Sequence, residues 1–191
     1  DRNSAIATVL AAVARQRWER LVPELARNPV FVRHEAHVLP GMFVMGATVN
    51  AKMAGKTLST AKDVLRSLMS TLATAAELEQ AKGEAMVIAT KALAQPDGLT
   101  SAWLDLDTYK LPSIAEQSST LQSISSNDVQ QIATLLFGKA AIASVAIGNG
   151  EHLKSELERE MPIELLGEVK LIPKSAAPTP TTKPSNSNKP D

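Results

Sequence analysis

Residues 74–82, TAAELEQAK, specify the start of a helix. A threonine followed three residues later by a glutamate is a capping box. In it, the Thr74 hydroxyl accepts a hydrogen bond from the Glu77 amide, and the Glu77 carboxylate reaches back to the Thr74 amide. Apolar residues then recur at helical spacing on one face, at Leu78, Ala81, Ala85, Ile88 and Ala92. We therefore expect a helix that begins after Thr74 and ends before the turn Pro96-Asp97-Gly98.

The residues before this helix predict two further helices and a hairpin. Residues 52–71 carry apolar residues at spacings of three and four, which is typical of a helix. Residues 30–39 alternate in part between apolar and polar, and residues 42–49 are apolar almost throughout. Pro40-Gly41 lies between these two segments as a turn signal, so they predict a β-hairpin. A helix over residues 4–21, rich in good helix formers, opens the chain.

The residues after the capped helix complete an α+β pattern. Helices are expected over residues 99–110, over residues 113–121, and from Ser125 or Ser126 to Phe137. A buried strand over 140–147, a helix over 151–159 and a last short strand within 163–172 follow. The expected fold class is therefore α+β, a mostly antiparallel sheet of about four strands with helices layered on one face.

The chain divides into a folded unit, residues 1–172, and a C-terminal tail, residues 173–191. The tail reads PKSAAPTPTTKPSNSNKPD and holds five of the 11 prolines but no Val, Ile, Leu or aromatic residue. Such a Pro/Thr/Ser-rich segment cannot bury enough apolar surface to offset its ordering entropy. We expect a disordered tail. This composition is found in extracytoplasmic bacterial proteins, so a periplasmic or extracytoplasmic location is an expectation, with the compartment left open.

Composition excludes several classes of function. The chain has 191 residues, 20 Lys+Arg and 20 Asp+Glu, and this balance argues against a nucleic-acid binder. Zero Cys excludes a disulfide framework, a cysteine zinc site and a thiol nucleophile. The longest strongly apolar run, residues 140–147, is too short to span a membrane. No signal-peptide pattern is present, since helical spacing begins close to Asp1.

One cluster, His34-Glu35-Ala36-His37, contains residue types that bind metals. The H-E-x-x-H zinc motif needs its histidines at i and i+4 on a helix, whereas here the spacing is i, i+3 in a strand-like segment. On a strand, His34 and His37 point to opposite faces. The inverted motif H-x-x-E-H is also absent. Surface residues on a hairpin are the favoured interpretation, a metal site at His34 and His37 is the alternative, and no catalytic residue is assigned.

Several motifs occur in a fixed order along the chain. TAAELEQAK is followed by Tyr109-Lys110-Leu111-Pro112, then by Ile124-Ser125-Ser126-Asn127-Asp128-Val129 with Ile132-Ala133, then by the apolar run that ends at Gly148. This order resembles the pitrilysin/insulinase-like zinc metallopeptidases, whose corresponding motifs are T-x-x-E-L-E-x-A-K, Y-x-L-P and I-x-x-V-T-x-x-D-V-x-x-x-A. The resemblance covers about residues 4–160.

The resemblance implies a domain from a protein whose halves close around a chamber. In that family the catalytic zinc sits on an H-x-x-E-H helix of the first half, which this chain lacks. The chain is therefore expected to be a non-catalytic second-half domain, inactive alone, and to lack the family's first strand. It would form chamber wall and help hold a peptide substrate or a catalytic partner. Zinc is expected in a sister peptidase domain or catalytic subunit, and no cofactor in this chain.

The resemblance also points to positions that would touch the substrate. The family's second half often offers an Arg and a Tyr, seven residues apart, just after the first helix. The counterparts here are Glu24 and Phe31, which supply neither the guanidinium nor the hydroxyl, and Arg20 and Arg27 only flank the place. Substrate-binding residues thus stay unassigned. The alternative function is a purely structural or scaffolding module with no role in proteolysis.

Overall fold

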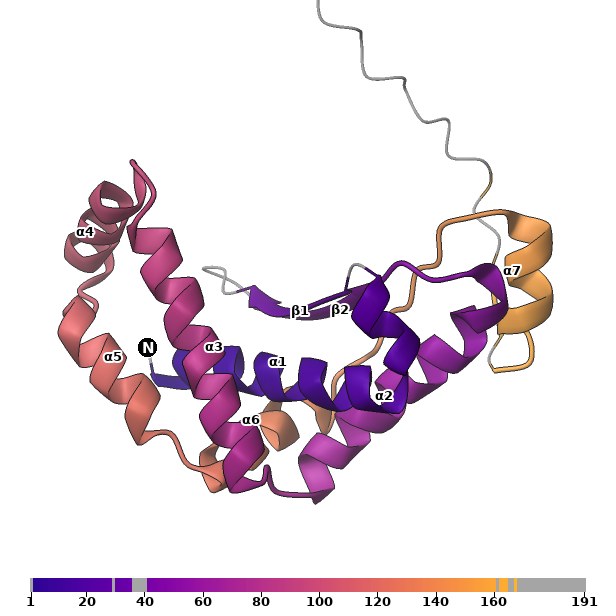
Figure 1. Cartoon of the computed structure of the whole chain (residues 1–191), viewed down its shortest axis with the longest axis horizontal. Coiled ribbons are helices and arrows are strands. Elements are labelled where there is room, and N and C mark those ends of the chain that lie inside the picture. The colour runs from indigo at the N-terminus through magenta and orange to yellow at the C-terminus, as the bar shows by residue number, and fades with distance from the viewer. Residues whose placement is uncertain (1, 29, 36–40, 161, 165–166, 168–191) are drawn as a thin grey trace, which may run out of the picture.

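The computed structural model describes residues 2–28, 30–35, 41–160, 162–164 and 167. Most of them are helical. The elements are α1 (Arg2–Leu21), η1 (Pro23–Arg27), β1 (Val30–Glu35), β2 (Met42–Ala47), η2 (Ala51–Met53), α2 (Ala54–Ser70), α3 (Ala75–Leu93), α4 (Gly98–Tyr109), α5 (Ile114–Ser123), α6 (Ser126–Phe137) and α7 (Gly150–Leu157), and Figure 1 labels the α-helices and strands.

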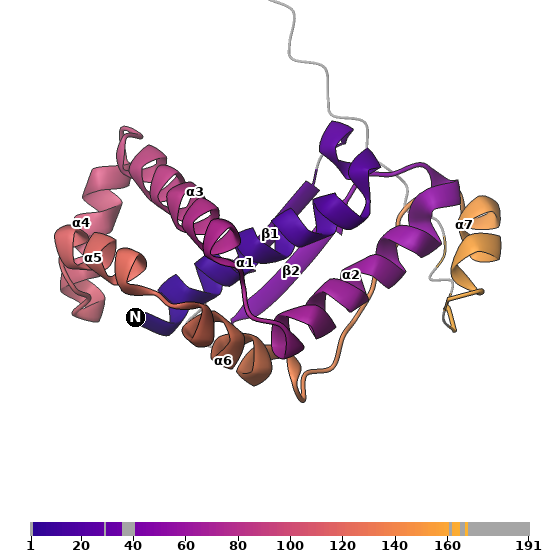
Figure 2. The same cartoon turned by 60° about the horizontal axis from the view of Figure 1, so that its bottom comes forward.

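Helix α1 is the centre of the fold. It packs against β1 and is surrounded by α2, α3, α5 and α6 (Figure 2). Its sequence is rich in Ala, Leu, Arg and Gln, which favour helix, and most of its apolar side chains are buried, as at Val9, Leu10 and Val13. Trp18 ties α1 to α2, because its Nε1 donates to the carbonyl oxygen of Thr57 at 3.2 Å. The core is therefore aliphatic and organised around one helix.

The capping box predicted at the start of α3 is confirmed. The Thr74 hydroxyl accepts from the Glu77 amide at 3.2 Å, and the Thr74 amide donates to the Glu77 carboxylate at 3.0 Å. The same carboxylate also pairs with two cations of α1, with Arg17 at 3.2 Å and with Arg20 at 2.9 Å. Glu77 thus caps α3 and joins it to α1. We call Arg17, Arg20 and Glu77 the α1–α3 ion cluster.

The sheet is smaller than the sequence predicts. Strands β1 and β2 pair antiparallel, with Val30 opposite Ala47 and Glu35 opposite Met42. Residues 140–147, predicted as a buried strand, are extended but pair with no described strand and are exposed, with Val145 at 84%. The described part of the chain is therefore mostly helical with a two-stranded antiparallel sheet, and the predicted four-stranded sheet with helices layered on it is wrong.

The error has a physical cause. A short apolar run predicts burial, but a strand also needs a neighbour to pair with its backbone groups. Within the described residues, no neighbour pairs with 140–147. Of the segment 163–172, the described residues are not in a strand and the others lie outside the described ranges, as does the tail 173–191. No described helix is both long and apolar enough to cross a membrane.

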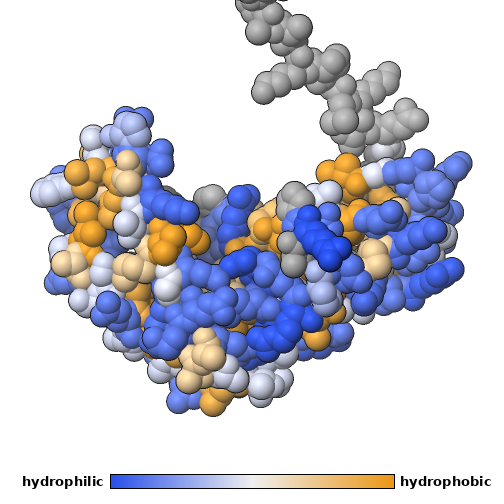
Figure 3. Space-filling view, in the orientation of Figure 1, coloured by the Kyte–Doolittle hydropathy of each residue, from blue (hydrophilic) through white to orange (hydrophobic). Residues whose placement is uncertain are grey.

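The described chain forms an arc. Helices α4 and α5, with the end of α3, make an arm at one end, α7 lies at the other, and the hairpin lies between them on the concave side (Figure 1). The arm exposes apolar residues at Leu99, Trp103 and Leu104 (Figure 3), and α4 contains no buried residue. The helical spacing of residues 99–110 correctly predicts a helix there, and the structure shows that the helix has little cover.

Candidate functional site

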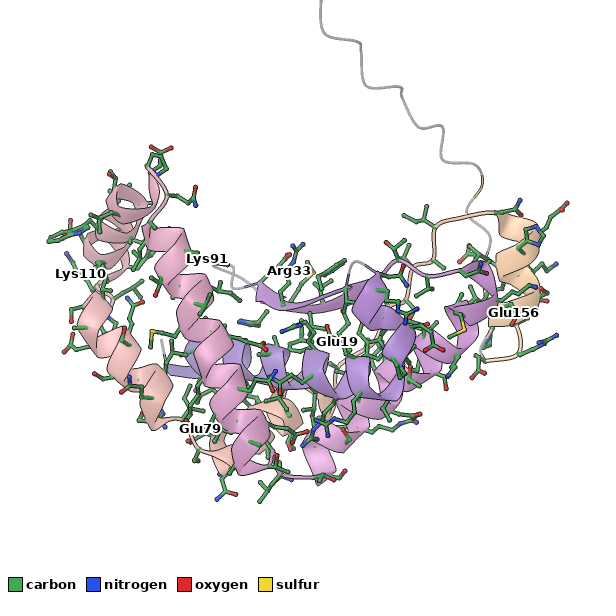
Figure 4. All side chains as sticks on the ribbon, viewed as in Figure 1. Glu19, Arg33, Glu79, Lys91, Lys110 and Glu156 are labelled. Carbon is green, nitrogen blue, oxygen red and sulfur yellow. The ribbon has the colours of Figure 1, made fainter. Side chains whose placement is uncertain are left out.

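The face of the hairpin that points away from the core carries exposed aromatic, apolar and cationic side chains. Successive strand residues point to opposite faces. Val30 and Val32 of β1, with Phe43 and Met45 of β2, pack against the core. The residues between them form what we call the hairpin outer face, which comprises Phe31, Arg33, Glu35, Met42, Val44 and Gly46. Figure 4 shows the labelled Arg33 on the concave side, away from α1.

Arg33 is held by its neighbours along β1. Its guanidinium carbon lies 5.2 Å from the centre of the Phe31 ring, a cation–π geometry, and its Nε lies 2.6 Å from a carboxylate oxygen of Glu35. The side chain is still 61% exposed. Since a guanidinium has five N–H donors in a fixed fork, this placement orients the group while leaving donors facing solvent.

The Phe31 ring lies across the backbone of β2. Phe31 is opposite Gly46, and a Cβ added at Gly46 would stand 2.3 Å from the ring carbon Cζ. A glycine within a strand often marks such a close approach. The ring is 45% exposed, so one side of it faces solvent. The Phe31 ring, lying over Gly46, forms an apolar surface, and the Arg33 guanidinium is held beside it.

The two positions inferred from the resemblance lie in different surroundings. Glu24, in η1, lines a shallow hollow of about 480 Å³ together with Pro23, Arg27 and Asn28. Phe31 is not among the residues that line this hollow. Arg20, which flanks the position in sequence, is paired with Glu77. The structure therefore places Arg27 in the same hollow as Glu24, while Arg20 pairs with the start of α3.

The histidine candidates do not come together with other ligands. His34 is in β1 opposite Phe43, and strand alternation places it on the face away from Arg33. His37 lies outside the described residues. Among those that are described, no three or more His, Asp or Glu side chains are grouped so as to hold a metal ion. Because His37 lies outside that search, the metal site at His34 and His37 is not tested and stays the alternative interpretation.

Sequence reasoning singled out Phe31 but missed Arg33. The available signal was the alternation Val30-Phe31-Val32-Arg33. On a strand, one face then carries the two valines and the other face carries the phenylalanine and the arginine. The pattern does not predict which of these two faces packs against the core. Packing against α1 decides it, because Val30 and Val32 join the core cluster.

Comparisons with family models and with curated proteins find no match. Among solved structures, the chain is similar to a crystal structure described as a "putative zinc protease from Bordetella pertussis Tohama I". The two sequences are 26% identical, the match covers 69% of this chain and 74% of that chain, and the TM-score is 0.53. The chain therefore has a zinc-protease-like fold.

Proposed function

We propose that this chain is a non-catalytic domain of a zinc-metallopeptidase-like protein, which forms part of a chamber wall and helps hold a peptide substrate or a catalytic partner. The similarity to a zinc protease fold supports the family part of this proposal. Arg33 lies on the concave side (Figure 4), and Phe31 shares its face of β1; this placement supports the binding part and is the observation that carries the proposal.

The assignment of catalysis to another domain rests on ligand chemistry. A catalytic zinc is bound by three protein ligands and keeps an open position for water or substrate. The sequence has three His and no H-x-x-E-H motif. Zinc, which would polarise the scissile carbonyl and activate water, is accordingly assigned to a sister domain or subunit. This chain's own residues would bind and orient the peptide.

The hairpin outer face suits an extended peptide with apolar and acidic side chains. The Phe31 ring and the exposed Met42 offer apolar area, and aromatic residues, Met and Arg are enriched at binding surfaces. The Arg33 guanidinium can donate to a peptide carboxylate or carbonyl in a fixed direction. Glu35 keeps that direction set in the free protein, which reduces the ordering cost of binding.

A purely structural or scaffolding module is the second candidate. The observation that favours it is the identity of Glu24 and Phe31, which lack the guanidinium and hydroxyl that the family resemblance implies for substrate contact. Peptide binding discriminates between the two functions. A scaffolding module is not expected to bind an isolated unstructured peptide through Phe31 and Arg33.

Phe31→Ala and Arg33→Gln are each expected to weaken peptide binding about tenfold, the usual cost of truncating an interface anchor. The measurement is fluorescence anisotropy of a labelled, unstructured peptide that alternates leucine and aspartate. Both side chains are exposed, so circular dichroism should be unchanged. Arg66→Gln on α2, where the side chain is 73% exposed, is the matched control and should bind like the parent chain. Equal binding by all variants, or none by the parent, would refute the binding role.

A further inference from the structure

The hairpin outer face presents three different chemical groups in a row along β1. Phe31, Arg33 and Glu35 are alternate residues of the strand, so their side chains lie on one face. In order, they supply an aromatic ring, a cation and an anion. The residues opposite them on β2 carry no charge, and they are Gly46, Val44 and Met42. The charges of the hairpin outer face therefore belong to one strand and have a fixed order.

An extended peptide that lies along β1 repeats at the same interval as this row. A strand advances about 3.3 Å per residue, so alternate residues are about 6.6 Å apart in both chains. The Arg33 guanidinium carbon and the centre of the Phe31 ring are 5.2 Å apart, which is close to that repeat. Alternate side chains of the peptide can therefore contact Phe31, Arg33 and Glu35 in turn. This contact uses side chains on the face of the hairpin and no backbone group at either edge.

Arg33 can bind a second carboxylate besides that of Glu35. Glu35 approaches the guanidinium at Nε, at 2.6 Å, and the Arg33 side chain remains 61% exposed. The Nη end of a guanidinium can donate two parallel hydrogen bonds to one carboxylate. An apolar side chain two residues from that carboxylate on the peptide would then cover the Phe31 ring, which is 45% exposed.

Glu35 determines which residue suits the third position. A peptide carboxylate on Arg33 lies near the Glu35 carboxylate, so two anions share one cation and repel each other. A basic residue at the next alternate position of the peptide removes this repulsion, because its cation lies beside both anions. Glu35 is 27% exposed and can be reached from solvent. The aliphatic stem of a lysine there would cover Met42, which is opposite Glu35 and 52% exposed.

We propose that the hairpin outer face recognises an extended peptide segment with an apolar, an acidic and a basic residue at alternate positions. These residues lie over Phe31, Arg33 and Glu35 respectively. The inference rests on the proposed function, since it names the class of peptide that the same site takes. Exposed ion pairs contribute little affinity each, but complementary charges discriminate between partners. The order of the three residues, rather than their number, therefore sets the specificity.

Two labelled, unstructured peptides of identical composition test the order. In both, single serines separate three residues, which are leucine, aspartate and lysine in one peptide and leucine, lysine and aspartate in the other. Fluorescence anisotropy with the 191-residue chain should show about tenfold tighter binding of the first peptide. The reason is that the second replaces two attractions by two repulsions. High salt should reduce this ratio, because it screens exposed charges.

Exchanging the charges on the protein should reverse the preference. The double variant Arg33→Glu with Glu35→Arg is expected to bind the leucine, lysine, aspartate peptide more tightly. The matched control is the same exchange on α2, Asp63→Arg with Arg66→Asp, at an ion pair whose side chains are 56% and 73% exposed. This control should keep the parent's preference. Circular dichroism of each variant checks that the fold is unchanged.

A single substitution isolates the part played by Glu35. Replacing the peptide lysine by serine should weaken binding to the parent chain about threefold and should not weaken binding to Glu35→Gln, which has no anion to neutralise. Equal binding of the two peptides by the parent chain would overturn the inference, as would an unchanged preference in the folded Arg33→Glu, Glu35→Arg variant. Peptide binding that still depends on Phe31 and Arg33 would then leave the proposed function standing. If the parent chain bound no peptide, both would fall.

Discussion

Glu77→Gln is expected to lower the free energy of unfolding at pH 7 by about 3 kcal/mol, because it leaves the buried Arg17 guanidinium without its counter-charge. Glutamine fills the same volume and can still serve the capping box, so the loss isolates the α1–α3 ion cluster. Both Arg17 and Glu77 are more than nine-tenths buried. Urea unfolding followed by circular dichroism measures the change.

The pH dependence gives this prediction a second readout. Burial alone would raise the pKa of Glu77, but the hydrogen bonds from Arg17 and the Thr74 amide, with the Arg17 charge, outweigh burial and lower the pKa to about 2. The ordinary value is 4.5, so the stabilisation is complete above that pH and is lost as the pH falls from 4.5 toward 2. Relative to Glu77→Gln, the parent chain should therefore lose about 2 kcal/mol of its advantage by pH 3.

The control lies on the same helix. Glu79, labelled in Figure 4, is 73% exposed and forms an ion pair with Lys82 of the same helix at 3.2 Å. Glu79→Gln should change the free energy of unfolding by less than about 0.5 kcal/mol at any pH tested. If Glu77→Gln were equally mild, the ion cluster would not be what joins α3 to α1.

Leu10→Ala is expected to cost about 3 kcal/mol, within the range for a buried leucine whose cavity cannot collapse. Leu10 is fully buried in α1, at the centre of the core cluster. The same substitution at Leu135, which is 72% exposed on α6, should be nearly neutral. Urea unfolding of both variants checks the pair. Similar losses at the two sites would contradict the placement of α1 at the centre of the fold.

Local signals in the sequence predict local structure well. The Thr74 capping box and the cap at Ser125 both form, because each depends on residues three apart in the chain. The pairing of Glu77 with Arg17 depends on residues far apart in sequence, and no local pattern reveals it. Residues 140–147 fail as a predicted strand for a related reason, since their apolar pattern is local, whereas a strand also needs a neighbour that the described residues do not supply.

The candidate site shows the same limit. Phe31 could be identified as a counterpart of a family position, but its ring geometry depends on Gly46, a residue on the opposite strand. Arg33 could be found only once the core had fixed which face of β1 is open. Helical spacing in residues 99–110 predicts α4 correctly but not its exposure. The spacing shows which side of the helix is apolar, but not whether another element packs against that side.

An amide NMR titration of the ¹⁵N-labelled chain with an unstructured peptide, in the presence of zinc, tests the central claim most directly. The protein spectrum reports binding, and the peptide spectrum reports cleavage in the same sample. We expect shifts at Phe31, Arg33 and their β2 neighbours, with the peptide intact. New peptide termini that appear with zinc and vanish with a chelator would contradict the account and would make His34 and His37 the first ligands to examine.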